Sequence, residues 1–263
     1  MNRLTIAIPT FRRPQDLKRA VRGVLEQAGA LVGGSSVEAR EPEGDAAGAP
    51  DMDGGAGRGV SDVEVLVIDH DAQGTGREAA LTAAADAGVA VRSSVEGAKG
   101  PESVGLRYCV EERPGVAAVR NRALDETGGR DLLVFIDDDE EPEPGWLAAL
   151  VGLWASTGCQ AVAGPVIPVY EVEPEAWVRQ GEFFVRRTWP TGTVRPVAAS
   201  NCLLLDLGFV RRAGLRFDEA FGATGGEDTL FTRRLSAAGG VIRWCDEARV
   251  RDHVPASRLT RPW

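Results

Sequence analysis

The chain has 263 residues, of which 43% are hydrophobic and 26% charged, an ordinary composition for a globular protein. Its formal net charge of −9 argues against nucleic acid as a partner, because a phosphate backbone would be repelled. No apolar run reaches the roughly 18 residues of a membrane span, and no signal-peptide pattern is present. We therefore expect a cytoplasmic protein; peripheral association with the inner face of the cell membrane stays open, and the oligomeric state is not predicted.

The first half of the chain alternates strand and helix patterns. In chain order we expect a strand over residues 4–9, a helix from Pro14, a strand over 63–68, a helix over 77–87, short strands over 89–92 and 106–109, a helix over Val116–Glu126 and a buried strand over Leu132–Ile136. This alternation indicates an α/β fold with a mostly parallel, Rossmann-like sheet flanked by helices.

Residues 29–62 interrupt the pattern with Gly, Ala, Glu, Asp and Pro, which predicts a flexible inserted surface loop. Beyond residue 145 we expect a helix over 146–154, an interrupted strand over 160–169, a strand over 197–205 and helices over 209–213 and 228–238. We interpret the chain as one compact domain over residues 1–263.

Five consecutive carboxylates, Asp137 to Glu141, follow the strand Leu132–Ile136. Adjacent carboxylates at the mouth of a buried strand repel one another and lose hydration, so the run favours a bound cation. Oxygen ligands suit a hard ion such as Mg²⁺ or Mn²⁺. Asp69 ends the strand predicted over 63–68. Because ligands of such sheets bind at the carboxyl ends of the strands, Asp69 and the aspartates from Asp137 to Asp139 should face one crevice.

Three further sites combine chemistry with position. Glu227 and Asp228 follow two glycines at a predicted helix start, where a carboxylate either caps the helix or acts as a base. His253 follows a late strand and is either a metal ligand or a surface residue. Arg120 lies on the helix before the aspartates and either faces solvent or binds phosphate.

Two alternative motifs are excluded by their context. The segment from Gly74 to Ala79 fits the spacing of a dinucleotide fingerprint, but Asp69, His70 and Asp71 separate it from the strand end and would repel a pyrophosphate. The run beginning at Asp137 lacks the glycine and the final glutamate of a calcium-binding EF-hand loop. No phosphate-binding loop of the GxxxxGK[ST] type occurs.

Taken together, several segments resemble glycosyltransferase family 2, whose members are inverting enzymes with the GT-A fold. The segments are residues 8–13, 67–69, 115–124, 135–139 and 225–228, in this order and spacing. Within the family, the chain is most similar to bacterial exopolysaccharide glucosyltransferases of the succinoglycan type. It departs from the family at His70, where a second Asp is usual, and at Gly240, where processive members carry Gln in a QxxRW signature.

The resemblance implies a nucleotide-binding half (1–145) and an acceptor-binding half (146–263). It also implies a role for each matching residue. It assigns catalysis to Asp228 as general base, with Glu227 positioning the acceptor, and metal binding to Asp139 and His253, with Mn²⁺ or Mg²⁺ as the ion. It assigns nucleotide binding to Pro9, Thr10, Arg12, Asp69, Arg120, Asp137 and Asp138. The expected partners are a nucleotide-sugar donor, with UDP as its nucleotide, and a saccharide, lipid-linked or small-molecule acceptor that receives one sugar.

Two other functions remain open. A sugar-phosphate nucleotidyltransferase uses similar acids on a similar sheet, but a glycine-rich loop after its first strand is typical, and residues 9–13 lack those glycines. A catalytically inactive nucleotide-sugar-binding protein would keep the same motifs.

Overall fold

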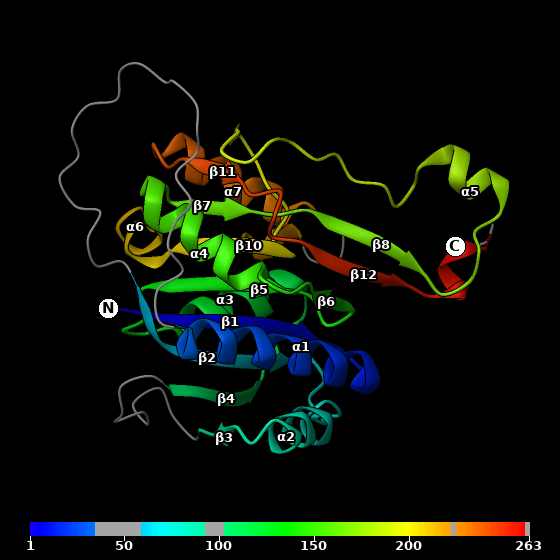
Figure 1. Ribbon diagram of the computed structural model, residues 1–263, viewed down its shortest axis with the longest axis horizontal. Coiled ribbons are helices and arrows are strands. Elements are labelled where there is room, and N and C mark those ends of the chain that lie inside the picture. The colour runs from blue at the N-terminus through cyan, green and yellow to red at the C-terminus, as the bar shows by residue number, and fades with distance from the viewer. Residues whose placement is uncertain (35–58, 93–102, 222–224, 261–263) are drawn as a thin grey trace.

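Strands and helices alternate in the computed structural model, which describes residues 1–34, 59–92, 103–221 and 225–260 (Figure 1). The strands are β1 (Asn2–Thr10), β2 (Val60–Asp69), β3 (Ala90–Val91), β4 (Ser103–Val110), β5 (Leu132–Ile136), β6 (Glu140–Pro142), β7 (Ala161–Ala163), β8 (Val166–Tyr170), β9 (Val194–Arg195), β10 (Cys202–Asp206), β11 (Ile242–Trp244) and β12 (Val250–Val254). The helices are α1 (Pro14–Gly33), α2 (Arg77–Asp86), α3 (Val116–Glu126), α4 (Trp146–Thr157), α5 (Ala176–Gly181), α6 (Leu207–Arg212) and α7 (Glu227–Ala237), with short 3₁₀ turns η1 (Glu219–Phe221) and η2 (Ala256–Leu259).

The main sheet has the strand order β3-β4-β2-β1-β5-β10-β7-β11-β9 within the described residues. The first five of these strands are parallel neighbours, and β10 then pairs antiparallel with both β5 and β7. The predicted α/β fold with a mostly parallel sheet is confirmed. Because β1, β2 and β5 are parallel neighbours, their carboxyl ends bring Thr10, Asp69 and Asp137 to one edge of the sheet.

Helices cover both faces of the main sheet, so its central strands are apolar on both sides. On one face Leu4, Ile6 and Ile8 of β1 pack with α1, α2 and α4. On the other face Ala7 and the alternate residues of β5 pack with α3, α6 and α7. Two hydrophobic clusters therefore fix the strand register, since a shift by one residue would exchange the faces.

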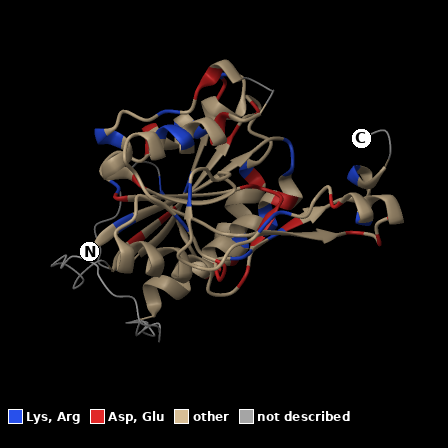
Figure 2. Cartoon of the chain, turned by 90° about the horizontal axis from the view of Figure 1, so that it is seen from above, with Lys and Arg blue, Asp and Glu red and all other residues tan. Residues whose placement is uncertain are grey.

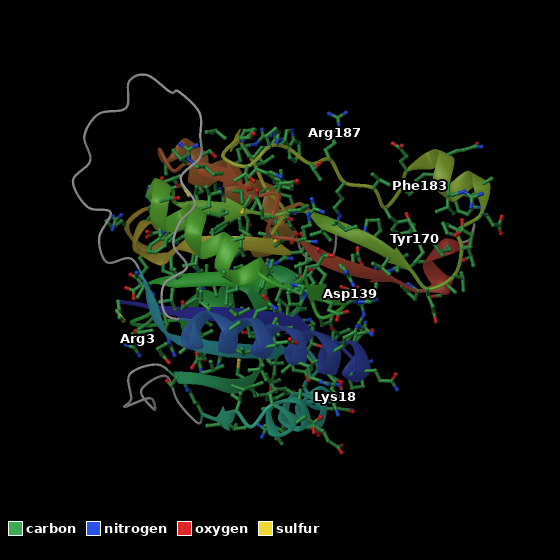
Figure 3. The ribbon with its side chains drawn as sticks, in the orientation of Figure 1. Arg3, Lys18, Asp139, Tyr170, Phe183 and Arg187 are labelled. Carbon is green, nitrogen blue, oxygen red and sulfur yellow. The ribbon has the colours of Figure 1, made fainter. Side chains whose placement is uncertain are left out.

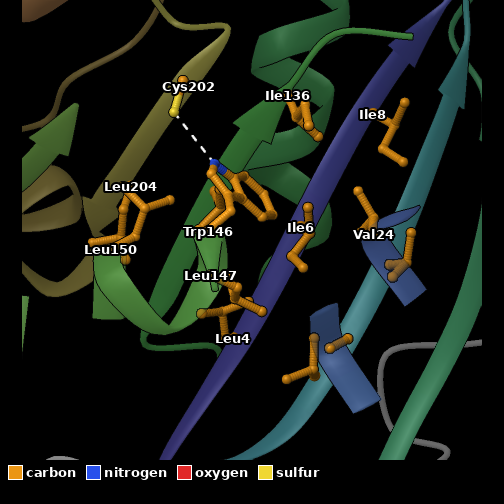
Figure 4. Close-up of a cluster of buried hydrophobic side chains, with 14 of the residues drawn as sticks. Leu4, Ile6, Ile8, Val24, Ile136, Trp146, Leu147, Leu150, Cys202 and Leu204 are labelled. Atoms are coloured by element: carbon orange, nitrogen blue, oxygen red, sulfur yellow. Dashed lines mark hydrogen bonds between the residues drawn. The ribbon is translucent and has the colours of Figure 1, made fainter. Parts of the chain in front are cut away.

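Trp146 anchors the first of these clusters at the start of α4 (Figure 4). Its side chain is fully buried among Leu4, Ile6 and Leu150, and its indole N–H donates to the Cys202 sulfur at 3.3 Å. The indole thus buries a large apolar surface while its one polar atom keeps a partner.

A second, smaller sheet has the order β6-β12-β8. Its strands β8 and β12 run away from the main sheet and carry α5 and η2 at their far end (Figure 1). Val178, Val254 and Leu259 form a small apolar cluster there. Strand β6 follows the aspartates directly, so this sheet holds the C-terminal segment against them.

The bounds predicted for the insertion at 29–62 need correction. Helix α1 continues to Gly33, because Leu31 and Val32 still pack against the core, and β2 already begins at Val60, which pairs with Asn2. The rest of that predicted loop, residues 35–58, lies outside the described residues. None of the helices in the described ranges is long and apolar enough to span a bilayer.

Candidate active site

A cavity of about 390 Å³ lies at the carboxyl ends of β1, β2 and β5. It brings together eight residues from the sheet edge and four from elsewhere: Pro9, Thr10, Phe11, Arg13, His70, Asp137, Asp138 and Asp139, with Val116, Val119, Arg120 and Arg258. Six of the predicted nucleotide- or metal-binding residues are among them. Acidic and basic segments meet at the base of the arm formed by β8 and β12 (Figure 2).

Asp138 is the buried member of the aspartate run and points into the protein. It accepts hydrogen bonds from the Thr10 hydroxyl at 2.8 Å and from the Arg13 guanidinium at 3.2 Å. These bonds tie the turn after β1 to the turn after β5. Asp138 therefore organises the cavity wall.

Burial disfavours the charged form of several acids in this wall. Desolvation, opposed only in part by Thr10 and Arg13, raises the pKa of Asp138 to about 6. Desolvation also raises the pKa of Asp137 and, together with the charge of Asp137, raises the pKa of Glu140 well above its ordinary value. A cation would stabilise the charged forms of these closely spaced carboxylates.

Arginine side chains already supply positive charge to Asp139. Arg13 donates to its carboxylate at 2.8 Å, and Arg258 of η2 lies 3.6 Å from the same oxygen. Although burial alone would lower it, the charges of Asp138 and Asp139 raise the pKa of Arg13. Figure 3 shows Asp139 between α1 and the base of the arm.

His253 lies next to Asp139 through the pairing of β12 with β6. Its backbone N–H donates to the Asp139 carbonyl at 3.1 Å, and both residues line a second cavity of about 600 Å³. The imidazole Nε2, however, lies 2.9 Å from a Glu141 carboxylate oxygen. Among the described residues, no three or more His, Cys, Asp or Glu side chains converge as a complete metal shell.

This donor set fits a Mg²⁺ or Mn²⁺ ion that completes its coordination with phosphate oxygens and water. Such ions are commonly held by one or two carboxylates plus substrate phosphates. Asp139 would supply one such carboxylate, and its neighbours Asp137 and Asp138 are acids whose charged forms desolvation disfavours.

Asp69 is fully buried and does not line the cavity, so the expectation that it faces one crevice with the aspartate run is wrong. Its carboxylate accepts the backbone N–H groups of Asp71 at 2.9 Å and Gly76 at 2.8 Å, and the Tyr108 hydroxyl at 2.5 Å. A carboxylate thus occupies the turn that leads into α2, where a dinucleotide fingerprint would bind pyrophosphate. The rejection of that motif is consistent with this geometry.

Arg12 follows β1 in a left-handed backbone conformation, with φ of 55°. Its side chain is largely exposed, at 62%, and lies 3.3 Å from Asp71. This arginine is not among the residues that line the cavity, whereas Pro9 and Thr10 are.

Arg120 connects the cavity to α7. Its guanidinium forms an ion pair with the buried Glu227 and lies 4.0 Å from Asp137. Arg120 and Glu227 are only 7% and 4% exposed, so neither faces solvent. The second carboxylate oxygen of Glu227 is buried and has no hydrogen-bond partner among the described residues.

Asp228 follows Glu227 in the first turn of α7 and is partly exposed. The residue at the helix cap is Gly226, so Asp228 does not serve as the cap. Its two carboxylate oxygens accept the backbone N–H groups of Thr229 at 2.6 Å and Ser200 at 3.4 Å. Asp228 is thus an accessible carboxylate next to the Arg120–Glu227 pair, although it is not among the residues that line the cavity.

Six cavity residues carry no role predicted from the sequence: Phe11, Arg13, His70, Val116, Val119 and Arg258. The first three adjoin predicted residues, so their positions in the sequence could have indicated them. No sequence pattern marks Arg258, because it reaches the aspartates only through the folding of β12 and η2.

Comparison with protein families gives a match to the model described as "Glycosyl transferase family 2" over residues 60–205. The chain is 34% identical over 184 residues to the succinoglycan biosynthesis protein ExoM of Rhizobium meliloti (strain 1021). That similarity covers 68% of this chain and 57% of the relative, so the chain spans little more than half of that protein's length.

Solved structures with the same fold include GalNAc-T7 with UDP, GalNAc and Mn²⁺, at a TM-score of 0.65 and 13% identity. That match covers 99% of this chain and 45% of the other. S. aureus TarS 1–349 in complex with UDP-GlcNAc aligns with a TM-score of 0.59 and 12% identity, over 96% of this chain and 58% of that chain. The predicted GT-A fold is confirmed by these similarities.

Proposed function

The chain belongs to glycosyltransferase family 2, and we propose that it is a metal-dependent inverting enzyme that moves one sugar from a UDP-sugar to a hydroxyl group. The acceptor would be a saccharide, a lipid-linked saccharide or a small molecule. The similarity to a succinoglycan biosynthesis protein supports a place in exopolysaccharide synthesis.

One observation carries this proposal. The cavity at the carboxyl ends of the parallel strands is lined by three adjacent aspartates together with Arg13, Arg120 and Arg258. Such a mixture of acids and guanidinium groups suits a diphosphate, because arginine forms bidentate hydrogen bonds with phosphate and carboxylates hold a divalent ion. The UDP complexes among the fold relatives support the choice of nucleotide.

In the proposed reaction, Asp228 removes the proton from the acceptor hydroxyl as its oxygen bonds to the anomeric carbon. The bond from that carbon to the diphosphate oxygen breaks on the opposite face, which inverts the configuration. Arg13 and Arg258 are placed to bind the departing diphosphate. A divalent ion on Asp139 would supply further neutralisation of its charge.

Release of nucleoside diphosphate from a panel of nucleotide sugars, with Mn²⁺ and with EDTA, tests the proposal. We expect release of UDP that requires both the metal and a saccharide acceptor, with slow release to water alone. A nucleotidyltransferase would instead release pyrophosphate from a nucleoside triphosphate and a sugar phosphate. A protein that binds UDP-sugars without any release would be inactive, which would refute the proposed transfer.

A further inference from the structure

Glu140 is the first residue of β6 and follows the three aspartates directly. It is only 1% exposed. One of its carboxylate oxygens, Oε2, accepts the backbone N–H of Asp137 at 3.1 Å, and the Glu140 N–H donates to the Asp137 carbonyl at 3.3 Å. Glu140 thus closes the turn that carries the aspartates.

The other carboxylate oxygen of Glu140 reaches a different segment. Oε1 accepts a side-chain N–H of Asn201 at 2.7 Å, and Asn201 is itself only 8% exposed. Asn201 immediately precedes β10, whose first residue, Cys202, pairs with Ile136 at the end of β5. One buried side chain therefore connects the aspartate turn to the segment that enters β10.

The residues just before Asn201 lie against the first turns of α7. The Ser200 N–H donates to the Asp228 carboxylate at 3.4 Å. One helical turn later, the Thr232 hydroxyl oxygen lies 3.1 Å from both the backbone nitrogen and the carbonyl oxygen of Ala198. Residues four apart share one face of a helix, so this face of α7 rests on the segment that Glu140 holds through Asn201.

We propose that Glu140 is a positioning residue, which holds the aspartate turn and the Asp228 end of α7 at a fixed distance from each other; this inference rests on the proposed function. Glu140 is not among the residues that line the cavity of about 390 Å³, so it acts through its two partners. An ionised carboxylate accepts at both oxygens, and here each oxygen faces an N–H donor. Without Glu140, the Asp137 N–H and the Asn201 amide would lose these partners inside the protein, which is unfavourable.

Two truncations of the whole chain separate the two connections. Asn201→Ala removes the link towards Asp228 and leaves the bond from the Asp137 N–H to Glu140 in place. We expect turnover to fall about tenfold, with UDP affinity in Mn²⁺ within about threefold of wild type, because a displaced base slows transfer without weakening the donor. Glu140→Ala removes both connections, so turnover and UDP affinity should each fall about tenfold.

The measurements are calorimetry with UDP and Mn²⁺ for affinity, and UDP release for turnover. UDP release uses the UDP-sugar and the saccharide acceptor that react fastest in the nucleotide-sugar panel. Both are made well below the Tm of each variant, so that the folded chain is compared.

An exchange of the two side chains tests the contact itself. In Glu140→Gln combined with Asn201→Asp, the amide at position 140 can donate to the carboxylate at position 201 while its oxygen accepts the Asp137 N–H. We expect turnover and UDP affinity within about threefold of wild type, a rescue that a loss of general stability would not produce.

Gln27→Ala is the matched control. Gln27 is also a buried amide, and its side-chain oxygen accepts the Gly145 N–H at 2.9 Å before α4. This variant should lower the Tm and leave turnover and UDP affinity unchanged.

Wild-type turnover in Asn201→Ala would overturn the inference, and so would an exchanged pair that loses as much activity as Asn201→Ala. Both results are available even if Glu140→Ala does not fold. If the wild type transfers no sugar from any UDP-sugar, the proposed function itself fails. If the wild type transfers sugar and Asn201→Ala equals it, only the inference about Glu140 fails.

Discussion

At the residue scale, the three adjacent aspartates have different surroundings. Asp138 is buried and bonded to Thr10 and Arg13, Asp139 lies between two arginines, and Asp137 lies within 4.0 Å of Arg120. Their order in the chain makes the difference, because successive side chains beyond a strand end point in different directions. Within one run of like charges, Asp138 is therefore bonded inside the protein, whereas the carboxylates of Asp137 and Asp139 lie beside arginines of the cavity.

Asp138→Asn should change how stability depends on pH. With a folded pKa of about 6 in place of the ordinary 3.8, the folded state holds its proton while the unfolded state has lost it. Ionisation therefore costs stability increasingly as pH rises through this window, by up to about 3 kcal/mol. Urea unfolding in EDTA should show that the free energy of unfolding of the variant increases relative to that of the wild type as the pH rises from about pH 4 to pH 8. A difference that stays constant would contradict the raised pKa.

Asp228→Asn should abolish sugar transfer and leave donor binding nearly intact. The amide keeps the shape of the side chain, and its single oxygen can still accept the Thr229 N–H, but it cannot take a proton at neutral pH. We expect turnover to fall by at least about 100-fold, with UDP affinity within threefold of wild type. Turnover at the wild-type rate would remove Asp228 from the role of base.

At the scale of elements, helices α3 and α7 meet through the buried Arg120–Glu227 pair. Helix α3 contributes Val116, Val119 and Arg120 to the cavity of about 390 Å³, and α7 carries Asp228. Breaking a buried ion pair is strongly destabilising because it leaves one charge uncompensated. The Arg120–Glu227 pair therefore holds α3 and α7 at a fixed distance from each other. The expectation that Glu227 positions the acceptor remains a prediction; the geometry places its carboxylate on Arg120.

Glu227→Gln should raise the donor KM about tenfold if Glu227 acts by holding Arg120 beside Asp137. In an Arg120→Lys background the same change should add little, because the contact that it removes is already altered. Donor KM and turnover of both single variants and the double variant make the measurement. Fully additive effects on KM would show that Glu227 acts independently of Arg120.

At the scale of the whole molecule, the site joins segments that are far apart in the sequence. Arg13 comes from the start of the chain, Asp139 from its middle and Arg258 from its end, and the three form the wall shared by the two cavities of about 390 and 600 Å³. The nucleotide-binding and acceptor-binding halves remain a prediction, with the aspartate turn at their junction. This wall is complete because the small sheet pairs β12 with β6, and β12 leads directly into the turn that carries Arg258.

Binding of metal and UDP together should therefore stabilise the folded chain. A ligand present at 100 times its Kd adds about 2.7 kcal/mol to the free energy of unfolding. We expect Mn²⁺ with UDP to raise the Tm of the wild type by several degrees, and Asp139→Ala to lose most of this increase. Asp86→Ala is the control, because that aspartate pairs with Lys18 on the surface. An equal shift in Asp139→Ala would argue against Asp139 as the metal-binding residue.

The sequence by itself predicted the elements of the first half of the chain and the chemistry of the sheet edge, whereas in the second half the strand predicted over 197–205 begins only at Cys202. The buried strand Leu132–Ile136 and the helix Val116–Glu126 have the predicted bounds, because uninterrupted apolar runs and flanking Gly residues are local signals. Parallel neighbours in an α/β sheet bring their carboxyl ends together, so the meeting of Thr10 and Asp137 at one edge could also be predicted.

Only the tertiary structure decided which side chains are engaged within the protein and which face the cavity. Asp69 and His70 are adjacent in the chain, yet the first is buried by its bonds to Gly76 and Tyr108 and the second lines the cavity. Arg258 reaches Asp139 through long-range strand pairing that no local pattern encodes. The physical reason is that burial and hydrogen-bond partners come from residues distant in sequence, whereas periodicity reports only what neighbours along the chain prefer.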